Sequence, residues 1–164
     1  MKYFGTDGFR GEANKGLNVY HALKIGRFLG NYFSKDNGYN GKIVIGKDTR
    51  RSSYMFEDAL AAGITSSGSN AHLLHVTTTP SVSYITRSED FDCGVMITAS
   101  HNPYYDNGIK IINSEGEKMA DDFLEKLENY IDSDITDIDL AVGDKIGRTV
   151  DFIGGRNRYI AVSY

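Results

Sequence analysis

A serine that could carry a chemical group lies in the polar segment Thr98-Ala99-Ser100-His101-Asn102-Pro103, which directly follows an apolar run, 93–98, expected to be a buried strand. In open α/β sheets, functional groups collect just beyond the carboxyl ends of the strands. The Ser100 hydroxyl is therefore expected to be accessible and to rest on a rigid base. From the residues alone, an inert polar turn over 98–102 remains an equally open interpretation.

Two other chemistries fit the serine and the histidines poorly. A hydrolase pair of Ser100 and His101 is disfavoured because sequence neighbours rarely place an imidazole nitrogen on a hydroxyl, and no Gly-x-Ser-x-Gly elbow surrounds the serine. A zinc site that combines His101 with His72 and His75 is disfavoured because the latter two, three apart on an expected strand, point to opposite faces. We interpret these histidines as packing or surface residues.

Two further segments contain groups that suit phosphate chemistry. The glycine-rich segment 4–11 includes Thr6 and Arg10, and an arginine fork fits phosphate oxygens, although a plain structural turn is equally compatible. Lys110 lies between two isoleucines in the expected strand 108–112. There it can act as a proton donor and acceptor if partial desolvation lowers its pKa; a solvated edge-strand lysine is the alternative.

A third polar segment, 46–50, follows the first expected strand and contains Asp48 and Arg50. These two side chains belong to the same rim of the sheet as the Ser100 segment, because carboxyl ends of parallel strands meet there. An ion pair that shapes the loop is the default interpretation.

The elements that must position these groups follow from apolar periodicity and turn residues. Strands are expected at 42–46, 71–76, 93–98 and 108–112 with an edge strand at 145–150, and helices at about 18–34, 54–67, 79–88, 119–131 and 156–164. Thr79 is expected to cap the third helix, with Pro80 in its first turn, and a turn-rich break is expected over 35–41.

The expected fold is a three-layer α/β/α domain with a mixed, mainly parallel four-stranded sheet plus a small edge strand. The connection between the strands at 93–98 and 108–112 has only about ten residues, whereas a parallel return normally needs a dozen or more. The fourth strand is therefore expected to run antiparallel to the third.

Composition limits the class of protein. A chain of 164 residues is enough for one domain with a proper core, and its net charge of −4 argues against a nucleic-acid surface. The single Cys93 cannot form an internal disulfide and is expected to be a small buried residue. Apolar runs fall short of a membrane span and the N-terminus lacks a signal-peptide core, which indicates a cytoplasmic protein.

Taken together and in order, these segments resemble the first-domain motifs of the α-D-phosphohexomutase family, and the resemblance runs across essentially the whole chain. It rests on residues 4–11, 46–50, 79–82, 98–103 and 107–111. In detail, segments 4–8 and 105–110 look more like the phosphoglucosamine mutases than like the phosphoglucomutase/phosphomannomutase enzymes.

The resemblance implies a mechanism and a set of site residues. Ser100 would carry a phosphoryl group, form a sugar bisphosphate, and so move phosphate between the 6- and 1-positions of a hexose. It would also bind Mg²⁺ through its phosphate, with three aspartates of a second-domain motif absent from this sequence. Matched by motif, the catalytic residues are Ser100, Lys110 (a candidate acid/base), His101 and Arg10, and the phosphate-binding residues are Thr6, Arg10, Asn102 and Arg50. The match of Arg50 is weaker, since the resemblance implies a partly structural role for it.

The resemblance also implies a division of the chain. Residues 1–153 would form the phosphoserine domain, and 154–164 would begin an uncapped helix leading to an absent second domain. The chain alone is then expected to have negligible mutase activity. Expected partners are a sugar phosphate and the remaining mutase domains, without nucleic acid or membrane, and a homodimer is left open. A phosphoglucomutase/phosphomannomutase domain and a non-catalytic phosphate-binding module are the alternatives.

Overall fold

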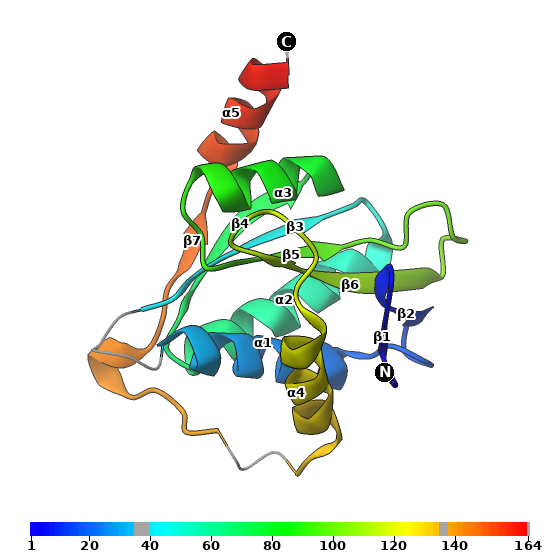
Figure 1. The fold of residues 1–164 in the computed structure, drawn as a ribbon, viewed down its shortest axis with the longest axis vertical. Helices are drawn as coiled ribbons and strands as arrows, with labels where there is room; N and C mark the ends of the chain where they lie inside the picture. Colours follow the sequence, from blue (N-terminus) through cyan, green and yellow to red (C-terminus); the bar gives the residue numbers. More distant parts are fainter. Residues whose placement is uncertain (35–39, 135–137, 164) are drawn as a thin grey trace.

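The structure, a computed structural model, describes residues 1–34, 40–134 and 138–163. In this part of the chain, seven strands form one sheet in the order β1-β2-β6-β5-β3-β4-β7 (Figure 1). The strands are β1 (Phe4–Gly5), β2 (Gly8–Glu12), β3 (Lys42–Lys47), β4 (Asn70–Val76), β5 (Cys93–Ile97), β6 (Asp106–Asn113) and β7 (Thr149–Asp151). The helices are α1 (Val19–Ser34), α2 (Arg51–Ser66), α3 (Thr79–Ser88), α4 (Asp121–Asp132) and α5 (Ile153–Ser163), with a 3₁₀ turn η2 (Gly143–Lys145).

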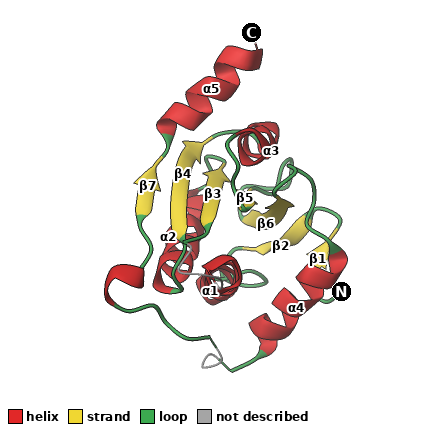
Figure 2. Ribbon diagram, turned by 60° about the vertical axis from the view of Figure 1, so that its left-hand side comes forward, coloured by secondary structure: helices red, strands yellow, loops and turns green. Residues whose placement is uncertain are grey.

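Helices cover both faces of the sheet, which confirms the three-layer α/β/α architecture. The α1, α2 and α4 helices pack on one face and α3 and α5 on the other (Figure 1). A large apolar cluster fills the first interface, and a smaller one, which includes Val44, Leu74 and Phe91, fills the second. The α5 helix extends beyond the end of the sheet (Figure 2). The sheet is therefore buried on both faces, and functional groups must lie at its rim.

The sheet has more strands than the sequence indicated, and it is not mainly parallel. Segment 4–11, interpreted above as a glycine-rich loop, lies in the hairpin β1–β2, which extends the sheet by antiparallel pairing with β6. Three of the six strand pairings are parallel and three are antiparallel. The hairpin has little apolar alternation, and its turn needs Gly8 at φ 89°, where a Cβ atom would lie 2.5 Å from the Ile109 carbonyl oxygen.

Strand β6 runs antiparallel to β5, as the short connection predicted. Ile97 pairs with Ile109, and the Thr98 N–H donates to the Gly108 carbonyl at 2.9 Å, which continues the ladder beyond β5. Gly108 permits this close approach, because a Cβ atom there would lie 2.6 Å from the Thr98 carbonyl oxygen. The loop that contains Ser100 is thus anchored at both ends to paired strands.

Several element ends differ from the sequence-based expectation. Thr78, not Thr79, caps α3, since its hydroxyl accepts from the Ser81 N–H at 3.2 Å. The α2 helix begins at Arg51, three residues earlier than expected, without a side-chain cap. The edge strand is confirmed but is limited to β7. The predicted break over 35–41 lies mostly outside the described residues.

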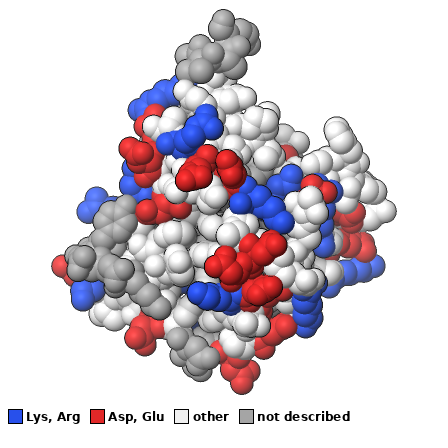
Figure 3. All heavy atoms as spheres, viewed as in Figure 1, with Lys and Arg blue, Asp and Glu red and all other residues white. Residues whose placement is uncertain are grey.

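The surface carries charges of both signs. On the face shown in Figure 3, lysine and arginine side chains alternate with aspartate and glutamate rather than gathering in one patch. Within the described ranges, every helix is too short or too polar to cross a membrane.

Candidate active site

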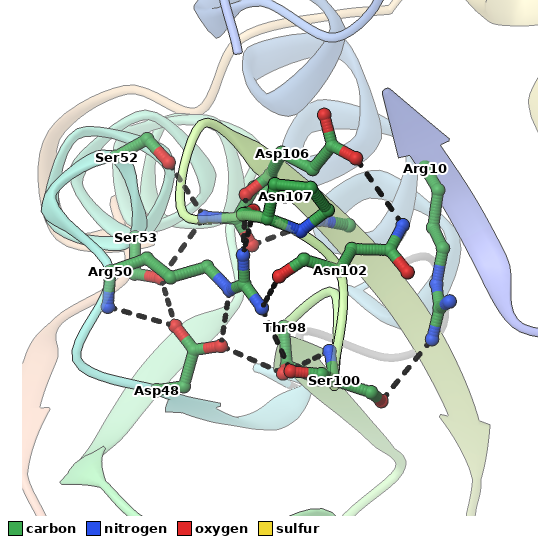
Figure 4. Close-up of polar contacts among 12 residues, drawn as sticks. Arg10, Asp48, Arg50, Ser52, Ser53, Thr98, Ser100, Asn102, Asp106 and Asn107 are labelled. Atoms are coloured by element: carbon green, nitrogen blue, oxygen red, sulfur yellow. Dashed lines mark hydrogen bonds and ion pairs between the residues drawn. The ribbon is translucent and has the colours of Figure 1, made fainter. Parts of the chain in front are cut away.

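Ser100 is exposed at the start of the loop that follows β5. Its backbone has φ 52°, in the left-handed region that few residues other than glycine adopt, and such conformations cluster at functional sites. The Arg10 Nη2 group donates to the Ser100 Oγ atom at 3.2 Å (Figure 4). The loop therefore presents a serine hydroxyl both to solvent and to a guanidinium group.

Side chains hold both peptide groups of Ser100. Its N–H donates to Thr98 Oγ1 at 3.0 Å, and its carbonyl accepts from Arg50 Nη2 at 2.8 Å. The Thr98 hydroxyl in turn donates to Asp48 Oδ2 at 2.8 Å. Because these contacts fix the backbone on each side of the Cα atom, they fix the direction of the Ser100 side chain.

Arg50 is the centre of this network (Figure 4). Each of its five N–H groups has an acceptor within 3.1 Å. The acceptors are the Asp48 carboxylate and the backbone carbonyls of Ser100, Asn102, Pro103 and Asp106. The expected ion pair with Asp48 is present at 3.0 Å. The phosphate-binding role that the resemblance implied for Arg50 stays a prediction; in this structure its five donors bind Asp48 and the loop carbonyls.

Asp48 follows β3 and accepts hydrogen bonds from three residues. Besides Arg50 and Thr98, the Ser53 hydroxyl donates to it at 2.7 Å. Partial burial raises the pKa of Asp48, but the hydrogen bonds from Ser53, Thr98 and Arg50 outweigh burial and bring it below its usual 3.8. The carboxylate is therefore charged at neutral pH and balances the Arg50 guanidinium.

Asn107 joins the beginning of β6 to the same network. Its side-chain amide donates to the hydroxyls of Ser52 and Ser53 at 2.8 and 3.0 Å (Figure 4). Sequence reasoning missed this role, and it also missed the link between Thr98 and Asp48. The available signal was the position of Asp48 and Thr98 at the carboxyl ends of neighbouring parallel strands.

Arg10 reaches Ser100 from the opposite side of the loop. It lies on β2, where its backbone pairs with that of Gly108 on β6. Its Nε atom is buried and has no hydrogen-bond partner among the described residues. Unlike Arg50, it retains donor capacity beside the serine hydroxyl, which suits an anion at that position.

Thr6 and Lys110 share one cavity beside the β1–β2 hairpin. Both line a cavity of about 180 Å³ between the β1–β2 hairpin, β6 and α3, to which Ser83 and Lys118 also contribute. Lys110 is half-buried and lies two residues along β6 from Gly108. Because Arg10 pairs with Gly108 and side chains alternate along a strand, Lys110 lies on the same face of the sheet as Arg10, and the cavity adjoins the Ser100–Arg10 pair.

His101 and Asn102 lie on the exposed part of the loop. The Asn102 side-chain amide donates to Asp106 Oδ2 at 3.4 Å. Away from this loop, His72 packs edge-on against two phenylalanine rings and His75 pairs with an aspartate of β7. In residues 1–34, 40–134 and 138–163, no three His, Cys, Asp or Glu side chains are placed to hold a metal ion.

Buried Cys93 behaves as the sequence predicted. It is fully buried in the larger apolar cluster, and desolvation raises the pKa of its thiol far above the usual range. The thiol is therefore protonated and unreactive at neutral pH.

The chain is similar to known proteins over nearly its whole length. A phosphoglucosamine mutase of Lachnospira eligens is 64% identical over 97% of this chain and 36% of its own length, and one of Lachnoclostridium phytofermentans is 62% identical over 97% and 35%. The chain thus spans about a third of the length of these relatives. A crystal structure of a phosphoglucomutase/phosphomannomutase family protein from Burkholderia thailandensis has the same fold, with a TM-score of 0.78 and 22% identity over 96% of this chain and 34% of its own.

The family model for phosphoglucomutase/phosphomannomutase, alpha/beta/alpha domain I, matches residues 1–137, which include the hairpin, the Asp48–Arg50 segment and the Ser100 loop. The chain therefore belongs to the phosphoglucomutase/phosphomannomutase family, as an α/β/α first domain.

Proposed function

We propose that this chain is the first domain of a phosphoglucosamine mutase and that Ser100 carries the phosphoryl group. The observation that carries the proposal is the exposed Ser100 hydroxyl, held at φ 52° with the Arg10 guanidinium 3.2 Å away. Support for the substrate comes from the two relatives, both named phosphoglucosamine mutase, that match 97% of the chain.

In this proposal, phosphorylated Ser100 donates its phosphoryl group to the 1-hydroxyl of glucosamine 6-phosphate. The Oγ–P bond breaks, a bond from phosphorus to the sugar oxygen forms, the hydroxyl proton passes to a base, and the released Ser100 oxygen takes up a proton. The bisphosphate then reorients, and its 6-phosphoryl group passes to the Ser100 hydroxyl, which gives up its proton while the 6-oxygen takes one up, to leave glucosamine 1-phosphate. Phosphoryl transfer depends mainly on positioning and charge stabilisation, which this loop supplies.

The chain's own residues take separate roles in this reaction. A phosphoserine brings roughly −1.5 to −2 charge, and Arg10 is placed to offset part of it. Lys110, half-buried beside a cavity, is the proposed acid and base for the sugar hydroxyl, with Thr6 in the same cavity. His101 and Asn102 are proposed to contact the sugar phosphate from the exposed side of the loop.

We further propose that Mg²⁺ binds to the phosphate on Ser100, where it would neutralise charge during transfer. The fit is partial: phosphate oxygens suit Mg²⁺, but the described residues place no acidic cluster around Ser100. The remaining ligands would come from a second domain. Ser100 would therefore supply the metal ligand of this domain only after phosphorylation.

The proposed domain division places the phosphoserine domain in residues 1–153 and the beginning of a connection to a second domain in residues 154–164. The α5 helix supports this division, since it contacts α3 through Tyr159, whose ring lies 5.6 Å from that of Tyr84, but extends beyond the end of the sheet (Figure 2). The mutase activity would need the further domains, so the 164-residue chain alone is expected to leave glucosamine 6-phosphate unchanged.

A chimera tests the function directly. Residues 1–160 of this chain replace the matching first third of the Lachnospira eligens mutase, and interconversion of glucosamine 6-phosphate and 1-phosphate is measured. We expect the chimera to be active with Mg²⁺ and its Ser100→Ala variant to lose at least about 10³-fold in turnover, since the carrier hydroxyl is gone. A folded chimera without turnover, or a Ser100→Ala variant with unchanged turnover, would falsify the proposal.

A further inference from the structure

We infer that Arg50 is a positioning residue for phosphoryl transfer: it locks the strained backbone of Ser100 so that the hydroxyl faces Arg10, and it does not contact the phosphate itself. This inference rests on the proposed function, because it assigns Arg50 a role in the reaction of Ser100. It differs from the phosphate-binding role that the family resemblance implied, and it develops the loop-shaping ion pair with Asp48 that the sequence indicated.

The strain at Ser100 requires an outside restraint. A residue other than glycine in the left-handed region persists only where its surroundings over-determine the conformation. At Ser100 the restraints are the Thr98 hydroxyl on its N–H, at 3.0 Å, and the Arg50 guanidinium on its carbonyl, at 2.8 Å. The Ser100 side chain itself is exposed, so packing cannot supply the restraint.

Arg50 restrains the whole loop and not Ser100 alone. Its two Nη groups donate to four backbone carbonyls, which are spread from Ser100 to Asp106. The loop segment between β5 and β6 is therefore wrapped around one planar cation. Because Asp48 fixes the Nε side of that cation at 3.0 Å, the guanidinium itself is held to the end of β3.

Only arginine can make this set of contacts. A guanidinium presents five donors in a rigid planar fork, whereas a lysine ammonium presents three donors from one point. Arg50→Lys keeps the positive charge and much of the side-chain length, but it must abandon at least two of the five acceptors. The conservative variant therefore separates the geometry of the fork from its charge.

The two arginines at the site have separate functions in this scheme. Arg10 donates to the Ser100 Oγ atom, where the phosphate would be attached, while Arg50 binds backbone carbonyls behind it. Loss of Arg50 should misplace the reacting atom rather than remove a substrate contact. Misplacement by about 1 Å can lower turnover by about 10²-fold.

The test compares Arg50→Lys and Arg50→Met with the matched control Arg51→Met, which removes the exposed neighbouring arginine. In the chimera, we expect both Arg50 variants to lower kcat by about 10²-fold while KM for glucosamine 6-phosphate changes by less than about threefold. In the 164-residue chain, we expect faster hydrogen exchange at the amides of residues 98–107 in both Arg50 variants. Arg51→Met should match the wild type in both measurements.

The outcomes separate this inference from the proposed function. If Ser100→Ala abolishes turnover but Arg50→Lys keeps the wild-type kcat, or raises KM alone, Arg50 is not a positioning residue and the function stands. If Ser100→Ala leaves turnover unchanged, the function fails, and the exchange measurement still decides whether Arg50 restrains the loop. Unchanged exchange over 98–107 in Arg50→Lys overturns the inference even if Arg50→Met does not fold.

Discussion

Replacing Thr98 by valine removes a hydroxyl that makes two hydrogen bonds at the base of the Ser100 loop. Thr98 is buried, with 6% of its surface exposed. Its hydroxyl donates to Asp48 at 2.8 Å and accepts from the Ser100 N–H at 3.0 Å. Valine has nearly the same shape, so it removes these bonds without opening a cavity. Both the restraint on Ser100 and one of the donors to Asp48 are then lost.

The expected destabilisation follows from the two bonds. A hydrogen bond to a charged group contributes about 1.5–3 kcal/mol and a neutral one about 0.5–1.5 kcal/mol. Thr98→Val should therefore lower the free energy of unfolding by about 2–4.5 kcal/mol. At about 2–4 °C per kcal/mol for a domain of this size, Tm should fall by about 4–18 °C. The pKa of Asp48 should rise relative to the wild type, because one of the hydrogen bonds that lowers it is gone.

The assay is urea unfolding of the 164-residue chain at neutral pH, followed by circular dichroism, with hydrogen exchange at Ser100 as a second measurement. Thr98→Ser is the matched control, since it keeps the hydroxyl and loses only a methyl group, at a cost of about 1 kcal/mol. If Thr98→Val unfolds at the wild-type urea concentration and the Ser100 amide exchanges at the wild-type rate, the hydroxyl does not hold the loop and the reasoning fails.

Two further perturbations probe the scaffold around the site. Glu128 of α4 accepts hydrogen bonds from the backbone N–H groups of residues 2–4 at 2.7–3.0 Å. Glu128→Gln should therefore lower the free energy of unfolding by about 1–3 kcal/mol and speed hydrogen exchange in the β1–β2 hairpin. Unchanged exchange there would show that the carboxylate does not anchor the hairpin. Burial, helped by the charge of Lys42, lowers the pKa of His72 below its usual 6.5. Below about pH 6.5 the unfolded chain therefore binds more protons than the folded chain, and the free energy of unfolding should decrease as pH falls. His72→Phe should reduce this decrease between about pH 7 and pH 5 in urea titrations, and an unaltered slope would contradict it.

The sequence predicted the features that depend on local patterns. The antiparallel turn from β5 to β6 followed from the length of one loop, and the accessible position of Ser100 followed from its place beyond a buried strand. Most helix and strand positions followed from apolar periodicity. Each of these inferences uses residues that are close together in the chain.

The sequence did not predict features that depend on distant partners. The hairpin at segment 4–11 forms because it pairs with β6, about a hundred residues away. Its glycines interrupt the alternation of apolar and polar residues that would indicate a strand. The ion pair of Arg50 with Asp48, two residues away, was predicted from the sequence, but its other partners, four carbonyls more than 45 residues further along, were not. Every residue has a backbone carbonyl, so residue types do not indicate which carbonyls Arg50 binds. Only the folded loop reveals them.

Phosphopeptide mapping of the purified chimera examines the phosphoryl carrier directly. Intact mass gives the number of phosphates on the protein, and fragmentation of a peptide that spans Ala99 to Lys110 locates them. We expect one phosphate, on Ser100, that disappears in the Ser100→Ala variant and is discharged by glucosamine 6-phosphate. A fully active chimera without phosphate at Ser100 throughout turnover, or with phosphate only at another residue, would contradict the role of Ser100.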